Sequence, residues 1–525
     1  MNLSGHRLLA GGILLVWLAM LGWHVRREYF QPELTRLTEA ALSLAPGVNF
    51  YTLKMGEEVV GLATSRLDTV PEGFRLEDLL SLELPALGQT GTAVVRTGVD
   101  LSPALVMEGF SFSLDSEVGR YSVSGSVEGD TLLVMELNVA GSSQQMTHRL
   151  SQPPVFASAL PIRLAVGEGL QVGDRLQFPV FDPSSLSTRS VEVQVTAHDT
   201  ILVADSAALD HATGRWNPAR YDSVPSWKVV ESYGGVRVES WIDADGRTVQ
   251  ASSPLGFSMV KTEYELARQA QERARETLGS PIDDDVILST AIQSDVDLGE
   301  VEGYPELHFV LSGVDLQGFE LEGGRQRLRG DTLVVRQEDW NTLRPDYDEL
   351  PFPRMEFLEH LAPEPMIQSD DEGIVREAER ISGWRTFGRN DPVRIAGRLT
   401  MGVHGMLEKQ ITFSIPNAVQ VLESKQGDCN EHTVLFVAMA RALGLPARTA
   451  VGLVYLDGAF FYHAWPEVWL GEWVAVDPTF GQYPADAAHL RFVTGGLAQQ
   501  VEIVRLIGNL DIEVLQPPKP EEVGP

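Results

Sequence analysis

A cysteine, a histidine and an aspartate in the last quarter of the chain have the side-chain types that a thiol nucleophile requires. Cys429 is the only cysteine among the 525 residues, and His463 and Asp477 follow it at distances of 34 and 48 positions. A thiol paired with a histidine that a carboxylate orients can attack a carbonyl carbon and form a covalent acyl intermediate. The sequence must therefore show elements that bring these three residues together.

The residues around Cys429 predict that the cysteine begins a helix. Asp428 and Glu431 have the spacing of a reciprocal capping box, and Gly444 and Pro446 end the apolar run that follows. Unpaired backbone N–H groups and the positive end of the macrodipole meet at a helix start, and both favour a thiolate over a thiol. The same N–H groups could hold an oxyanion that forms on an attacked carbonyl.

Two hairpins predicted after this helix would bring His463 beside Asp477. The first turns at Asp457-Gly458, and the second has three residues between Trp469 and Trp473. A loop with any odd number of residues keeps His463 and Asp477 on one face of the sheet, whereas an even number separates them. Diagonal neighbours on that face lie about 7–8 Å apart, which is within side-chain reach.

The same stretch resembles the transglutaminase-like superfamily of papain-type thiol enzymes. The resemblance is carried by the Gly-x-Cys opening and by the segments ARALGLPAR, HAWPEVW and WVAVDPTFG, all within residues 417–482. It implies Cys429 as nucleophile, His463 as base and Asp477 as the residue that orients the histidine. Pro466 stands where the family usually has valine, which predicts an edge strand or a bulge beside the histidine, because proline cannot donate a hydrogen bond to a neighbouring strand.

The resemblance implies a thiol enzyme that acts on amide bonds of peptide or protein substrates through an acyl-enzyme. Water as the acceptor gives hydrolysis or deamidation, and an amine gives transamidation. Because bacterial members are more often peptidase-like than crosslinking, hydrolysis is the favoured expectation. No cofactor and no metal are expected, since Cys429, His432 and His463 are too few ligands for a closed zinc site. Trp465 is assigned to substrate binding, with a core or groove-wall position as its alternative.

The alternative function is that of a catalytically inactive protein. In that reading the thiol fold and the β modules form a scaffold for binding or for envelope assembly. The close spacing of short strand-like runs in residues 50–256 resembles the curved-sheet, lipoprotein-carrier-like β domains of envelope proteins. A third possibility is that the β modules recruit substrate for the enzyme.

Length and sequence pattern indicate a multidomain α+β protein with antiparallel β-rich modules, and the resemblance implies a C-terminal papain/transglutaminase-like α+β domain. Short alternating runs mark the β regions, and helical patterns dominate after residue 370. The predicted units are a transmembrane anchor or signal segment (1–27), a short helix plus an antiparallel β domain closed by a helix (28–280), a small β module (281–343), a Pro-rich linker (344–369), a transglutaminase-like domain (370–515) and a disordered tail (516–525).

Charge and hydropathy suggest where the protein acts. The 41 Lys and Arg against 73 Asp and Glu give a net charge of −32, which argues against nucleic acid as a partner. Residues 8–23 carry no charge and lack a small-x-small cleavage pattern, so we expect an uncleaved anchor. The expected location is a bacterial inner membrane with the body in the periplasm; the opposite orientation stays open.

Overall fold

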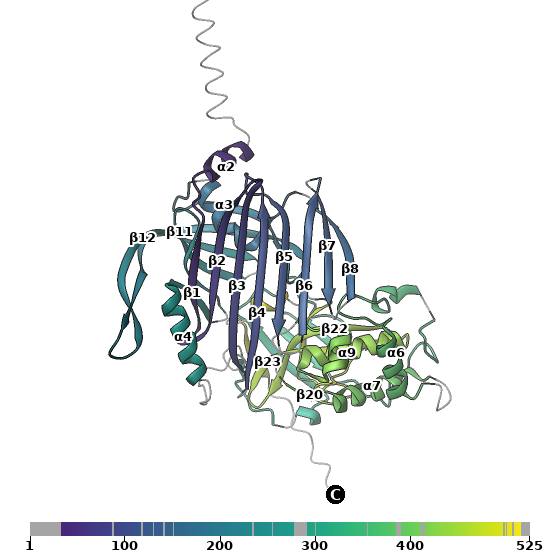
Figure 1. The fold of residues 1–525 in the computed structure, drawn as a ribbon. Helices are drawn as coiled ribbons and strands as arrows, with labels where there is room; N and C mark the ends of the chain where they lie inside the picture. The colour runs from purple at the N-terminus through teal and green to yellow at the C-terminus, as the bar shows by residue number, and fades with distance from the viewer. Residues whose placement is uncertain are drawn as a thin grey trace, which may run out of the picture.

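The structure is a computed structural model, and it is rich in β-structure with few helices (Figure 1). It describes residues 33–515 except 87–88, 117–118, 130, 140–141, 151, 168, 234–235, 255, 278–290, 300, 354, 385–389, 411–414, 497–498, 500 and 507–508. The predicted anchor (1–27) and the predicted tail (516–525) lie outside the described residues. Within the described part, no helix has the length and apolar character needed to cross a membrane.

A 15-stranded sheet forms the N-terminal half of the protein. Its central strand, β1 (Gly47–Met55), pairs with β2 (Glu58–Val70) on one side and with β15 (Phe257–Thr262) on the other, both antiparallel. The other strands are β3 (Gly73–Ala86), β4 (Gln89–Leu101), β5 (Met107–Ser116), β6 (Gly119–Glu128), β7 (Leu132–Val139), β8 (Ser142–Arg149), β9 (Val155–Phe156), β10 (Arg175–Asp182), β11 (Ser187–Asp210), β12 (Arg215–Tyr233), β13 (Val236–Ile242) and β14 (Thr248–Ser252). Only β9 and β10 pair in parallel among these described strands, so the region is antiparallel as its alternating runs predicted.

Three helices pack against this sheet (Figure 1). The helix α2 (Glu33–Ala41) packs on α3 (Leu160–Gly167), and α4 (Tyr264–Thr277) packs on β1, β2 and β12. The helix predicted to close the β domain (28–280) is therefore present as α4.

The C-terminal part combines a helical layer with a second sheet. Its helices are α6 (Glu372–Ser382), α7 (Pro392–Met406), α8 (Ala418–Ser424) and α9 (Cys429–Ala442), and its principal strands are β22 (Ala447–Leu456), β23 (Ala459–Trp469), β24 (Trp473–Ala475) and β25 (His489–Thr494). The short strands β20 (Glu408–Lys409) and β21 (Gln426–Gly427) pair in parallel just before α9. The helix α9 contacts all three other helices as well as β22 and β23, so it lies at the centre of this part.

Strands from residues 292–336 are built into the same C-terminal unit. The strand β16 (Ile292–Gln293) pairs with β23, and β17 (Glu306–Ser312) lies between β19 (Thr332–Arg336) and β26 (Asp511–Leu515), with β18 (Gln326–Arg329) at the edge. The Pro-rich segment 344–369 contains the short 3₁₀ helix η3 (Met355–His360) and buries Phe352 and Ile367 in the helical core. The ranges predicted as a small β module and a linker thus share sheets and a core with residues 370–515.

The large sheet and the C-terminal part are in contact. The Gln420 side chain of α8 donates a hydrogen bond of 3.3 Å to the Arg120 carbonyl at the start of β6. Met366 and Ile415 pack against the hydrophobic core of the large sheet. The two parts therefore meet close to the helices that surround α9.

Candidate active site

Cys429 is the first residue of α9 because the predicted capping box forms. Asp428 accepts a hydrogen bond from the Asn430 backbone (2.9 Å), and Glu431 accepts one from the Asp428 backbone (3.0 Å). Gly427 has φ +157°, and a Cβ at this position would lie 2.2 Å from the Glu431 Cβ. The glycine of the Gly-x-Cys motif therefore makes room for the side chain that completes the cap.

The predicted register of the second hairpin is confirmed. Trp469 lies opposite Trp473 and Glu467 opposite Ala475 in the antiparallel pair of β23 and β24. After Ala475 the chain leaves the strand, and Asp477 forms an isolated bridge with Gln482.

The open edge of β23 receives the start of α9. One edge of β23 pairs with β22 along its whole length, whereas the other, within the part of the chain that the structure describes, pairs with β16 and with β24 near its two ends. Between these ends the Ala464 carbonyl accepts a hydrogen bond of 3.0 Å from the Thr433 hydroxyl, and the Ala464 N–H donates to the Cys429 sulfur. The thiol therefore lies against the residue that follows His463.

Pro466 is at this same open edge. It lies two residues after Ala464, so its nitrogen faces the same way, and its carbonyl accepts a hydrogen bond of 3.0 Å from the Val476 N–H. Among the described strands, none pairs with this edge of β23 at Pro466, so the missing N–H costs no ladder hydrogen bond. The edge position predicted for Pro466 is confirmed.

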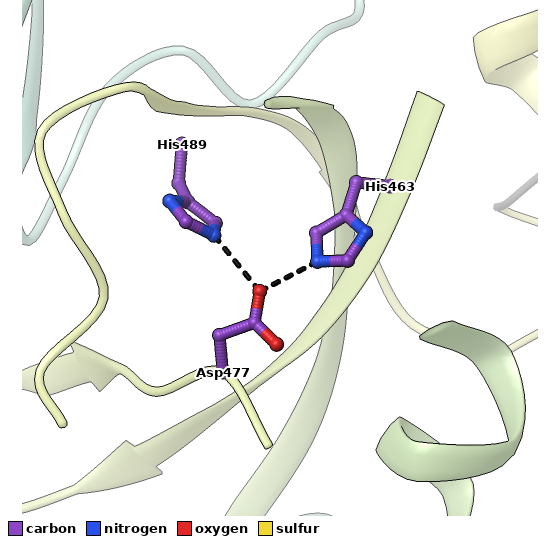
Figure 2. Close-up of side chains that lie close together, drawn as sticks. All are labelled: His463, Asp477 and His489. Atoms are coloured by element: carbon purple, nitrogen blue, oxygen red, sulfur yellow. Dashed lines mark hydrogen bonds and ion pairs between the residues drawn. The ribbon is translucent and has the colours of Figure 1, made fainter. Parts of the chain in front are cut away.

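His463 and Asp477 form a buried hydrogen-bonded pair (Figure 2). His463 Nε2 donates to Asp477 Oδ2 over 2.6 Å, and the ring's Nδ1 points away from the carboxylate. Asp477 Oδ1 accepts hydrogen bonds from the backbones of Thr479 (2.7 Å) and Phe480 (3.1 Å). Burial would raise the pKa of Asp477, but the neighbouring histidines outweigh it and hold this pKa well below its usual range.

A second histidine binds the same carboxylate oxygen. His489 Nε2 lies 3.0 Å from Asp477 Oδ2, and His489 Nδ1 lies 2.8 Å from Asp486 Oδ1 (Figure 2 shows the first contact). Both ring nitrogens face carboxylates, so both carry protons and the ring is a cation. Burial would lower the pKa of His489, but Asp486 and Asp477 outweigh burial and raise it to about 9. The pKa of Asp486 falls correspondingly, to about 2.

Sequence reasoning missed His489 and Asp486. Their signal was present as an Asp and a His three positions apart in the segment DAAHL, at the start of the buried strand β25. Nothing in the sequence indicated that β25 would pair with β22, which is what brings His489 close to Asp477. A charged residue pair directly before an apolar run is otherwise a common loop feature.

The surroundings of Cys429 raise its pKa. The side chain is half-buried. Burial is the largest cause, and the negative charges of Asp428, Glu431 and Asp477 add to it, while the Ala464 N–H acts in the opposite direction. This differs from the thiolate expected at a helix start, because the nearby carboxylates and burial outweigh the helix end. A thiolate at this position would therefore need a neighbouring cation to offset burial and these negative charges.

Aromatic rings support the His463 imidazole. Trp465 stacks on it with ring centroids 6.0 Å apart, and Phe480 stacks with centroids 4.9 Å apart. Trp465 has no exposed surface and also meets the His489 ring edge-on at 5.2 Å. This position differs from the substrate-binding role predicted for Trp465, because a side chain without accessible surface cannot contact a ligand.

Three side chains have a spacing that a metal ion could use. His463, Asp477 and His489 each offer one ligand atom, and these atoms lie within 4.8 Å of one another. In the described structure, the Asp477 oxygen and the two Nε2 atoms are already joined by hydrogen bonds. His432, considered from the sequence as a ligand, is instead buried, with Nδ1 2.7 Å from the Asp428 carbonyl. A metal would have to replace the shared protons, and the metal-free site stays a prediction.

Comparisons with known proteins bear on this site. Residues 388–478 match the Transglutaminase-like superfamily. This matched segment includes Cys429, His463 and Asp477, and it confirms the resemblance predicted from the motifs. No curated protein matches the chain. A solved structure of a candidate cysteine protease from Cytophaga hutchinsonii is similar at 15% identity and a TM-score of 0.27, over 42% of this chain and 82% of that chain.

Proposed function

We propose that the transglutaminase-like domain is a thiol enzyme that acts on amide bonds of peptide or protein substrates through an acyl-enzyme. The single observation that carries this proposal is the placement of Cys429. Its sulfur accepts the N–H of Ala464, next to His463, whose far ring nitrogen is held by Asp477 at 2.6 Å. This gives a nucleophile, a base and an orienting carboxylate in the order that acyl transfer requires.

The chemistry would begin with transfer of the Cys429 proton to His463. Asp477 binds Nε2, which leaves Nδ1 as the ring nitrogen that can take this proton. The sulfur then attacks the amide carbonyl and a C–S bond forms; the amide C–N bond breaks as the imidazolium gives its proton to the departing nitrogen, which leaves a thioester on Cys429 and a free amine. The backbone N–H of Cys429, at the start of α9, would donate to the oxyanion.

The second half-reaction determines the product. We propose hydrolysis as the main outcome, with water activated by His463 in the reverse proton transfer. An amine in place of water would give transamidation, and glutamine side chains in place of backbone amides would give deamidation. The resemblance to peptidase-like bacterial members of the superfamily supports hydrolysis.

Trapping the acyl-enzyme tests this function. The full-length protein is incubated with a mixed peptide pool, quenched in acid, and analysed by mass spectrometry for acyl groups on the Cys429 peptide. We expect adducts in the native protein, a loss of at least about 100-fold in His463→Ala and a smaller loss in Asp477→Asn. The exposed-histidine variant His308→Ala is the control, and adding a primary amine measures transamidation against hydrolysis. Adducts that persist in His463→Ala would overturn the proposed mechanism.

The alternative function is an inactive scaffold for binding or envelope assembly. It predicts that Cys429→Ser and His463→Ala leave the protein's cellular role unchanged, whereas loss of the large sheet abolishes that role. We also propose the membrane anchor at residues 1–27 with a periplasmic body, supported by the uncharged stretch at 8–23. Fractionation of cells with and without residues 1–27, followed by protease treatment of spheroplasts, tests both the anchor and its orientation.

A further inference from the structure

A cavity of about 280 Å³ lies where the large sheet meets the C-terminal part that contains Cys429. Residues from both the large sheet and the C-terminal part line it. Met146 of β8 and Leu186 come from the large sheet, Met366 comes from the segment before α6, and Asn430 and Thr433 come from α9. The cavity is smaller than the roughly 300–1,000 Å³ of pockets that take a whole small molecule, so its size fits one side chain.

The cavity adjoins the thiol through α9. Asn430 follows Cys429 directly, and Thr433 lies one helical turn further along. Thr433 and Cys429 also bind the same residue, because Ala464 accepts the Thr433 hydroxyl and donates to the Cys429 sulfur. One wall of the cavity is therefore the first turn of the helix that Cys429 begins.

Hydrogen bonds fix the turn by which the large sheet lines the cavity. The turn between β10 and β11 is held by Asp182, which accepts hydrogen bonds from the Ser184 backbone (2.9 Å) and from the Ser185 hydroxyl (2.9 Å). Arg189 donates to Ser185 over 3.1 Å. Leu186 follows in a left-handed conformation with φ 53°, which a leucine rarely adopts. The turn thus places Leu186 at the cavity, and the cost is the strain of its left-handed backbone conformation.

We propose that this cavity binds an apolar side chain of the substrate next to the attacked amide, so that the large sheet determines substrate specificity. The inference rests on the function proposed above and deepens it by naming the class of substrate. Met146, Leu186 and Met366 supply flexible or branched apolar surface, which favours a side chain such as leucine or methionine. Asp428 and Glu431 lie near the thiol, so an acidic substrate side chain is disfavoured.

Three reactive probes measure this preference. N-acetyl-glycyl, N-acetyl-leucyl and N-acetyl-aspartyl chloromethyl ketones all alkylate a thiol, because the sulfur displaces chloride and forms a C–S bond. The measured quantity is the second-order rate constant on the full-length protein, divided by that of the glycyl probe. This ratio cancels the intrinsic reactivity of the thiol, so it reports on the cavity even where Cys429 reacts slowly. We expect a leucyl ratio of about tenfold or more and an aspartyl ratio below one.

Substitutions of cavity residues test whether the leucyl ratio depends on the cavity. Met146→Trp fills it from the edge strand, and Leu186→Trp fills it from the turn; both should lower the leucyl ratio towards one. The matched control is Met355→Trp, at a methionine that is 74% exposed and does not line the cavity. Met146→Ala is a second, milder variant that should shift the preference towards a larger phenylalanyl probe. The melting temperature of each variant confirms that it is folded.

The outcomes separate the two proposals. A leucyl ratio that is near one in the native protein, or that survives in folded Met146→Trp, would overturn the cavity's role. Iodoacetamide, which has no side chain to bind, measures the thiol alone. If its rate does not depend on His463 while the leucyl ratio stays high and sensitive to Met146, the proposed catalysis fails and the binding cavity stands.

Discussion

His489 binds Asp477 through the same oxygen that holds His463: Nε2 of His489 lies 3.0 Å from Asp477 Oδ2. The carboxylate therefore lies between two imidazole rings and within one buried chain of charges that ends at Asp486. A cationic His489 keeps Asp477 ionised and fixes its orientation. Asp477, which orients the proposed base His463, is thus itself held in place by His489.

The His489 contact predicts how stability depends on pH. The pKa of His489 is raised from 6.5 to about 9 in the folded protein, so its stabilisation is complete below pH 6.5 and is lost as the pH rises through 9. The full effect is at most about 3 kcal/mol. The lowered pKa of Asp486, about 2 against 3.8, gives a stabilisation that is present above pH 3.8 and is lost as the pH falls through 2.

Thermal unfolding of His489→Gln from pH 5 to 9 tests this pH dependence. The native protein should lose stability steadily over the upper half of this range, and the variant should show a flatter profile. His308→Gln is the matched control, because His308 pairs with Glu306 at 2.7 Å but is 41% exposed. Equal slopes for native protein and His489→Gln would show that His489 is not charged in the fold.

Removal of the charge at Asp428 should make Cys429 more reactive. Asp428 raises the pKa of the thiol, and asparagine keeps a good N-cap while removing the charge. We expect Asp428→Asn to alkylate with iodoacetamide about threefold faster at pH 7. Asp371→Asn is the control, because Asp371 caps α6 in the same way. A slower reaction in Asp428→Asn with an intact fold would contradict the electrostatic account.

Gly427→Ala should destabilise the protein and the cap of α9. The added Cβ would meet Glu431 at 2.2 Å in a backbone conformation that alanine rarely adopts. We expect a loss of about 2 kcal/mol in the free energy of unfolding, measured in urea. Gly405→Ala in α7 has open space around the new methyl group and should instead gain up to about 1 kcal/mol. Similar effects for the two substitutions would refute the role of Gly427.

Metal removal should leave the site intact. Dialysis of the full-length protein against a chelator should change neither the alkylation rate of Cys429 nor the melting temperature. Added Zn²⁺ should slow alkylation, since it would compete for the thiolate and for the nitrogen atoms of His463 and His489. A melting temperature that falls on chelation and recovers with Zn²⁺ would identify a structural metal instead.

The local features of the site could be read from the sequence. The capping box at Asp428, the turn between Trp469 and Trp473 and the edge position of Pro466 depend on residues close together in the chain, and the structure confirms all three. The charge state of the thiol could not be read in this way. Cys429 begins the helix as expected, but the burial of the thiol and the charges of Asp428, Glu431 and the distant Asp477 raise its pKa.

The sequence by itself determined the local elements of this protein: the helix that begins at Cys429, the hairpin that turns between Trp469 and Trp473, and the antiparallel character of the N-terminal half. Only the tertiary structure decided that His489 shares Asp477, that residues 308–312 pair with 511–515, and that Leu186 of the large sheet reaches the cavity beside α9. The physical reason is range. Capping, turn geometry and strand alternation act over a few residues, whereas buried ion pairs and domain contacts join segments whose separation in the chain carries no signal of their proximity.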